Sequence, residues 1–198
     1  SAILVAAAVA ASHSRRTLSL VLLLAAPVVV LQWLHVVYRN ALIANLAYTA
    51  TALFYGLVVF YVLSDVLRPG PVTYDKISGA IAAYMLAAVG WASLYGLVDS
   101  LVPGSFNMSG LPNTEHLLSI RDLLYFSFTT LTTTGYGDIT PVSRHAQSLS
   151  ILEQMAGTFY VAILVARLAG LYQPGQSKPA LPRWRTWRAR RPPDGGAK

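Results

Sequence analysis

The sequence predicts an all-α membrane protein with four membrane-spanning helices per chain. Of its 198 residues, 55% are hydrophobic and only 12% are charged, whereas a soluble domain carries about 25% charged residues. The apolar residues are gathered in long blocks, and the mean hydropathy is +0.50. The absence of cysteine excludes disulfide frameworks, zinc–thiolate sites and cysteine nucleophiles.

Each predicted span is an apolar block long enough to cross a bilayer, which takes about 20 helical residues. The blocks cover residues 18–38, 42–67, 77–101 and 145–172. The short turn Arg39-Asn40 joins the first two into a hairpin, and Arg68-Pro69-Gly70-Pro71 ends that hairpin. A loop rich in Gly, Pro, Ser and Asn is expected from residue 102 to about residue 118.

The segment 119–131 is helical in character but too short to cross the membrane. Ser119 and Asp122 have the three-residue spacing of a capping box, which predicts a helix start at this point. Non-helical backbone is tolerated at membrane depth only where it lines a cavity or is buried in protein. A short re-entrant helix followed by an irregular loop satisfies that rule.

The loop that follows is Thr-Thr-Thr-Gly-Tyr-Gly-Asp, residues 132–138. A ring of backbone carbonyls replaces the hydration shell of a cation when successive residues point their oxygens at one axis. Alternating left- and right-handed backbone angles produce that arrangement, and glycine reaches positive φ without penalty. Gly135 and Gly137 stand where the alternation needs them, and the hydroxyl of Thr133 can add an oxygen at the inner end.

This loop resembles the selectivity-filter signature of the potassium channel pore-domain family, Thr-x-Gly-Tyr-Gly-Asp. The resemblance covers roughly residues 77–172 and is most specific over 125–141. It implies an outer helix, a re-entrant pore helix, a filter and an inner helix, in that order. It also implies that each chain supplies one filter strand to a tetrameric pore, so that the protein is a homotetramer. The positions implied to coordinate K⁺ are Thr133, Thr134, Gly135 and Tyr136, with Gly137 completing the turn.

The resemblance also implies residues that support the filter. Tyr125 falls where the family often has an aromatic donor to the filter aspartate, here Asp138. Thr134 stands where the family commonly has Val or Ile, so the β-branched shape is kept and a hydroxyl is added. Thr129 stands where some bacterial members carry a buried glutamate, so gating through that glutamate is not expected. The full set of expected filter-supporting residues is Asp138, Tyr125, Thr129, Thr130 and Thr132.

In the last span, Gly157 matches the inner-helix glycine of the family. It either permits bending or allows close packing, and the sequence leaves both open. Thr158, Val161 and Val165 share one helical face, which the resemblance places on the central cavity. Glu153 is an ionisable residue in an apolar span, and such residues are costly and usually functional. It is expected either to bond the back of the pore helix or to face the outer vestibule.

The predicted organisation has four parts. They are an N-terminal segment expected at the membrane interface (1–16), a peripheral transmembrane hairpin (17–71), the pore domain (72–172) and a basic cytoplasmic tail (173–198). Within the pore domain, the outer helix is 77–101, the pore helix 119–131, the filter 132–138 and the inner helix 145–172.

The charge distribution predicts the orientation in the membrane. With both termini in the cytoplasm, 12 of the 15 Lys and Arg residues lie inside and three lie outside (Arg39, Arg121 and Arg144). This asymmetry follows the positive-inside rule and predicts a multi-pass protein of the plasma (cell inner) membrane. The net charge of +7 is therefore interpreted as topology and lipid contact, not as nucleic-acid binding. The residues expected to contact anionic lipids are Arg183, Arg185, Arg188, Arg190 and Arg191.

These features predict a potassium-selective channel that conducts passively and needs no cofactor beyond the permeant K⁺ ions. The first two spans carry no Lys or Arg in their interiors, so an arginine-based voltage sensor is not expected. One alternative is a weakly selective monovalent cation channel, and another is a potassium transporter subunit, which needs four pore repeats where this chain has one. An enzyme is not expected, because Gly-x-Ser-x-Gly, His-Glu-x-x-His and paired intramembrane aspartates are all missing.

Overall fold

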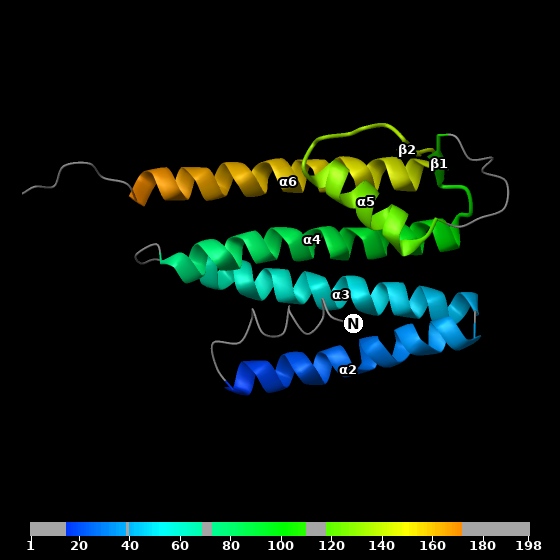
Figure 1. Ribbon diagram of the computed structural model, residues 1–198, viewed down its shortest axis with the longest axis horizontal. Helices are drawn as coiled ribbons and strands as arrows, with labels where there is room; N and C mark the ends of the chain where they lie inside the picture. Colours follow the sequence, from blue (N-terminus) through cyan, green and yellow to red (C-terminus); the bar gives the residue numbers. More distant parts are fainter. Residues whose placement is uncertain (1–14, 39, 69–72, 110–117, 172–198) are drawn as a thin grey trace, which may run out of the picture.

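The computed structural model describes residues 15–38, 40–68, 73–109 and 118–171. Long helices lie side by side along one common direction, and a short helix crosses between two of them at one end (Figure 1). In chain order the helices are α2 (Arg15–Tyr38), α3 (Ala41–Val66), α4 (Tyr74–Leu101), α5 (Ile120–Leu131) and α6 (Arg144–Leu171). The basic tail and nearly all of the expected N-terminal segment lie outside the described residues, so their predicted lipid contacts stay predictions.

Three of these helices are long and apolar enough to cross a membrane: α3, α4 and the Arg144–Arg167 part of α6. The first predicted span, residues 18–38, corresponds to α2, whose apolar part Leu24–Tyr38 is shorter than a full span among the residues searched. The predicted all-α membrane architecture is therefore confirmed. The pore-helix segment is also a separate short helix, α5, as the sequence predicts.

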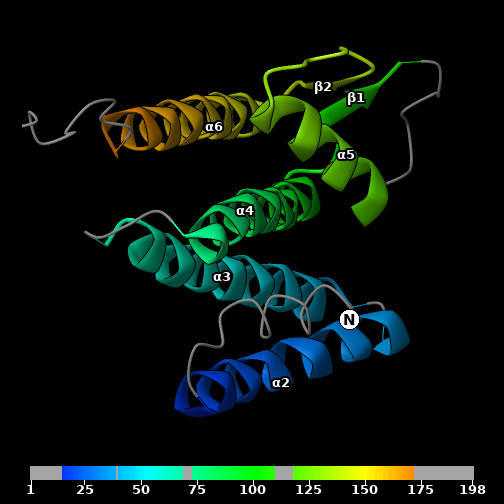
Figure 2. The ribbon, with the colours of Figure 1, turned by 60° about the vertical axis from the view of Figure 1, so that its left-hand side comes forward.

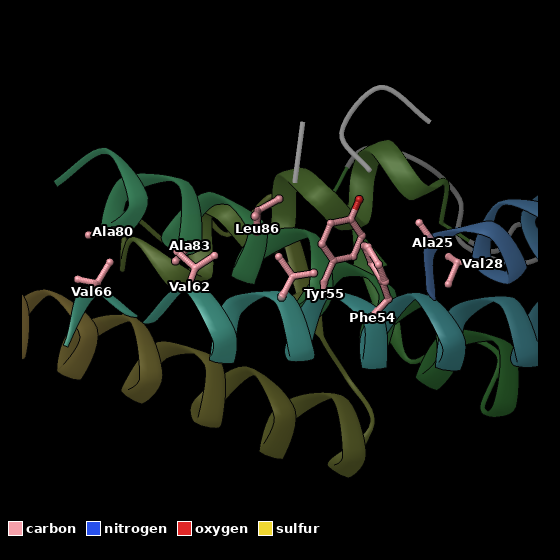
Figure 3. Packing of buried hydrophobic residues seen from close by; sticks show 10 residues of the cluster. Ala25, Val28, Phe54, Tyr55, Val62, Val66, Ala80, Ala83 and Leu86 are labelled. Carbon is pink, nitrogen blue, oxygen red and sulfur yellow. The ribbon is translucent and has the colours of Figure 1, made fainter. Parts of the chain in front are cut away.

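The peripheral hairpin packs on α4 through a continuous apolar core. Figure 3 shows Val62 and Val66 of α3 beside Ala80 and Ala83 of α4. Farther along α3, Ala25 and Val28 of α2 lie near Phe54. Ala80 and Ala83 of α4 are completely buried, and a Cβ on Gly79 would lie 3.4 Å from Val66. Small residues let two helix backbones approach closely, which is a common way for helices to pack in a bilayer. The α3–α4 interface is accordingly the most extensive in the described chain.

A second core holds α5 against α4. Tyr95 of α4, Phe106 in the segment between α4 and α5, and Phe126 of α5 meet edge to face, with ring centroids 5.0–5.5 Å apart. Such aromatic pairs contribute about 0.5–1.5 kcal/mol beyond the area they bury. The buried residues of α5 recur at helical spacing on one face (Leu123, Phe126, Ser127 and Leu131). This aromatic cluster therefore fixes α5 between α4 and α6 (Figure 2).

A two-stranded ribbon lies at the end of the pore domain where α6 begins. Strand β1 (Phe106–Met108) pairs antiparallel with β2 (Ile139–Pro141). The amide of Ser109 donates to the carbonyl of Asp138 at 2.7 Å, and that of Val142 donates to Ser105 at 2.8 Å. The sequence predicts only a loop over residues 102–118. Three-residue strands are too short to show the alternating pattern by which a strand is recognised.

The predicted capping box at the start of α5 is confirmed. The Asp122 carboxylate accepts the Ser119 amide at 3.1 Å, and the Ser119 hydroxyl caps the amide of Asp122 at 3.4 Å. Two amides of the first turn are thereby satisfied reciprocally.

We expect Ser119→Ala to lower the free energy of unfolding by about 1 kcal/mol, because the cap on the first turn of α5 is lost. Thermal unfolding of the purified protein in detergent measures this change. Ser119→Thr keeps the capping hydroxyl and serves as the control. Equal stability of the Ala variant and the wild type would show that the cap does not hold α5.

Candidate functional site

The loop after α5 has an alternating backbone. Thr133, Gly135 and Gly137 have φ values of 58°, 57° and 79°, whereas Thr134 and Tyr136 between them are not in the positive-φ region. The left-handed conformation expected at the two glycines is therefore present. Thr133 shares it, although a β-branched residue pays about 1–2 kcal/mol for this conformation. The strain at Thr133 was not predicted from the sequence, where the even spacing of 133, 135 and 137 is the one signal that points to it.

The amides of this loop are bound to the end of α5. The Thr133 amide donates to the Thr130 carbonyl at 3.0 Å. The amides of Thr134 and Gly135 both donate to the Thr129 carbonyl, at 2.8 and 3.1 Å. Thr129 and Thr130 thus contact the filter as predicted, but through main-chain carbonyls. The hydroxyl of Thr129 instead donates to the Phe126 carbonyl of its own helix.

The carbonyl oxygens of residues 133–137 differ from the loop amides that are hydrogen-bonded to α5. Within the described part of the chain, none of these five oxygens accepts a hydrogen bond. Because the loop amides face α5 and the backbone angles alternate, the carbonyls are available on the other side of the loop. A line of unpaired carbonyl oxygens can replace the water shell of a cation.

Two threonine hydroxyls form a short chain beside the filter. The Thr132 hydroxyl donates to the Phe128 carbonyl at 2.7 Å and lies 2.8 Å from the hydroxyl of Thr134. Because Thr132 has only one proton to donate, Thr134 is the donor in the second bond. The hydroxyl that distinguishes Thr134 from Val or Ile is therefore used to tie the filter to α5.

At the outer end, Tyr125 and Asp138 meet as the resemblance implies. A hydrogen bond to the Asp138 carboxylate raises the pKa of the Tyr125 phenol. The ring of Tyr125 is parallel to that of Tyr136, with centroids 6.4 Å apart and planes 4° apart. Asp138 also accepts the Ile139 amide at 3.0 Å. One aspartate therefore joins α5, the filter and β2.

The inner helix α6 packs directly on the end of α5 at Gly157. A Cβ placed on Gly157 would collide with the main-chain carbonyl of Leu131. Of the two alternatives for this glycine, close packing is thus present in the structure, and its role as a hinge stays a prediction. Thr158, Val161 and Val165 are exposed in the single chain. Their predicted position on a central cavity is untested.

Glu153 lies behind α5, completely buried. Its carboxyl group bonds the hydroxyls of Tyr95 on α4 and Ser127 on α5, the latter at 2.5 Å. The first of the two expected positions, at the back of the pore helix, is therefore the observed one.

A hollow of about 400 Å³ lies between the filter and α6. Its wall includes Thr129, Gly135 and Gly137 on one side and Gln147 and Gln154 on the other. The hollow is open at the surface of the single chain.

The same part of the chain matches known channels. Residues 77–173 match the sequence profile of a family described as ion channel. Residues 77–173 therefore belong to the ion-channel family. The prediction of a potassium channel pore domain is confirmed for this segment, and the family indicates a channel rather than an enzyme.

Two relatives match parts of the chain. Over 65 residues it is 40% identical to "Two pore potassium channel c" of Oryza sativa subsp. japonica. The aligned segment covers 33% of this chain and 13% of the relative. Over 96 residues it is 29% identical to "Protein LctB" of Bacillus caldotenax. This aligned segment covers 47% of this chain and 69% of the relative. No solved structure matches the chain.

We expect Gly135→Ala and Gly137→Ala to abolish ion conduction or selectivity. Each new Cβ meets nothing within 4 Å, so the penalty comes from the positive φ and amounts to about 1–2 kcal/mol per residue. Ion flux into liposomes that contain the purified variants measures the effect. Gly104 is a matched control, since its φ of 79° and open surroundings are the same but it lies outside the filter. Flux unchanged in both filter variants would refute the filter assignment.

Gly157→Ala is expected to destabilise the contact between α6 and α5, because the added methyl group overlaps the Leu131 carbonyl. Overpacking of this kind costs about 1–3 kcal/mol. The temperature of thermal unfolding and the ion flux should both decrease. Gly56→Ala in α3 is the control, since a Cβ there meets nothing within 4 Å. If Gly157→Ala is as stable as Gly56→Ala, the close packing at Leu131 is not needed.

Proposed function

We propose that the protein is a potassium-selective channel that conducts K⁺ passively down its electrochemical gradient. The observation that carries this proposal is the loop 133–137, whose backbone alternates in handedness and whose five carbonyl oxygens have no donor in the described chain. The hydroxyl oxygen of Thr133 adds a further ligand at the inner end. K⁺ is the substrate of this site, and Thr133, Thr134, Gly135 and Tyr136 supply the oxygens that bind it.

We further propose that four copies of the chain form the pore. One chain contributes one filter strand, and carbonyls from a single strand cannot surround an ion. The single chain also leaves large apolar residues of α6 exposed, including Met155, Phe159 and Ile163 at 48%, 57% and 56%. Tyr136 is 72% exposed beside the hollow between the filter and α6. A neighbouring copy can cover these surfaces and place an aromatic residue in the hollow.

The orientation and the lack of a voltage sensor belong to the same proposal. We place the α3–α4 turn and the end of α6 in the cytoplasm, where Lys76 and Arg167 both bind the carbonyl of Arg68. The filter then faces the outside of the plasma membrane. Because α2 and α3 carry no Lys or Arg in their interiors, the membrane potential has no arginine ladder to move.

Planar-bilayer recordings in mixed K⁺ and Na⁺ solutions, with equal total salt but different K⁺ concentrations on the two sides, test the proposal. The current should reverse close to the K⁺ equilibrium potential, because the carbonyl ligands replace the water shell of K⁺. The Gly104→Ala protein should behave like the wild type. A reversal near zero would instead support a weakly selective cation channel. Native mass spectrometry should give four chains per particle, and an active dimer or monomer would contradict the tetramer.

A further inference from the structure

Glu153 is an acidic residue with no cationic partner among the residues that the structure describes. Its side chain is 0% exposed in the middle of the membrane-spanning α6. In the described part of the chain, the one ion pair is between Arg68 and Asp65, far along the sequence from Glu153. The groups that face Glu153 are the Tyr95 phenol of α4 and the Ser127 hydroxyl of α5, with the Tyr84 phenol of α4 also within electrostatic reach. A buried carboxylate without a cation is very costly in an apolar medium.

The protons at this site can be assigned from the geometry. The hydroxyl oxygen of Ser127 lies 2.8 Å from the carbonyl oxygen of Ala88 and 2.5 Å from Oε1 of Glu153. Ser127 has one proton, and the Ala88 carbonyl can only accept. Both contacts are hydrogen bonds if Ser127 donates to Ala88 and Oε1 of Glu153 donates to Ser127. The phenol of Tyr95 then donates to Oε2, the carbonyl oxygen of the acid.

From this geometry we propose that Glu153 is a protonated, neutral positioning residue for the filter. Its Oε1–H holds Ser127 of α5, and its Oε2 is held by Tyr95 of α4. Three helices of the pore domain therefore meet at one uncharged carboxyl group. Ser127 stands two residues before Thr129, whose carbonyl binds the amides of Thr134 and Gly135. The hydrogen bond to Ser127 thus sets the position of the turn of α5 to which the amides of the filter are hydrogen-bonded.

A glutamine tests this assignment because it has the same donor and acceptor pattern. The Nε2 of Glu153→Gln can donate to Ser127, and its carbonyl can accept from Tyr95. Glu153→Leu has a similar volume but offers neither bond, so Ser127 and Tyr95 lose their partner. We expect Glu153→Gln to stay within about twofold of the wild type in ion flux. Glu153→Leu should lose about tenfold or more, since the buried hydroxyls of Ser127 and Tyr95 are then left unpaired.

Infrared spectroscopy tests the proton directly and does not depend on the proposed potassium conduction. The wild type minus Glu153→Gln difference spectrum at neutral pH should contain the carbonyl stretch of a protonated acid. In a Tyr95→Phe background that band should remain but move to higher frequency, because Oε2 loses its donor. A carboxylate band in the difference spectrum would overturn the proposal. So would a Glu153→Gln variant as impaired as Glu153→Leu, or a Glu153→Leu variant equal to wild type.

The readouts separate two kinds of failure. If the protein conducts no K⁺, the proposed function fails, while the infrared bands and the thermal stability of the two variants still decide the state of Glu153. Leu152→Met, at the neighbouring and half-exposed position, controls for a general effect of substitution in this turn of α6. It should leave the carboxyl band, the stability and the flux unchanged.

Discussion

The pore domain depends on how the last carbonyls of α5 are satisfied. A helix ends with four carbonyls that have no partner inside the helix. Here the loop amides bond the carbonyls of Phe128, Thr129 and Thr130, and the phenol of Tyr84 bonds that of Leu131 at 2.9 Å. A peptide that turns its amides toward a helix end must turn its carbonyls elsewhere. The requirement to satisfy the helix end therefore also creates the row of unpaired oxygens that can bind a cation.

The helices around α5 keep this end in place from two sides. Tyr84 of α4 bonds the Leu131 carbonyl, and its ring lies 5.2 Å from that of Tyr160, which bonds the Ala80 carbonyl at 2.5 Å. Gly157 of α6 brings the inner helix against the same Leu131 carbonyl. The neighbours of the filter are thus bound by hydrogen bonds to main-chain atoms, which can be made in only a few geometries. Such contacts can hold the strained positive φ of Thr133, because the surrounding structure over-determines it.

The sequence predicted most of the fold because hydropathy is a strong signal over a full span and capping residues mark where a helix starts. It predicted the glycines of the filter because positive φ strongly favours that residue. It did not predict the β1–β2 ribbon, whose pairing joins residues far apart in the chain by three-residue strands. It also did not place the partners of Glu153. Ser127 and Tyr95 look like ordinary helix residues until three helices are packed together, and no local pattern encodes that packing.

At the opposite end of the molecule, a main-chain carbonyl beside a helix end is again bound by groups from other helices. The carbonyl of Arg68 lies just after the end of α3, where the helix dipole is negative and a cation is favoured. Lys76 at the start of α4 donates to it at 3.1 Å, and Arg167 of α6 donates to it as well. One carbonyl thus joins the peripheral hairpin to the inner helix, as the Leu131 carbonyl joins α4 to the filter. The inner helix α6 is therefore held at two points, by α5 at Gly157 and by the α3–α4 turn at Arg167.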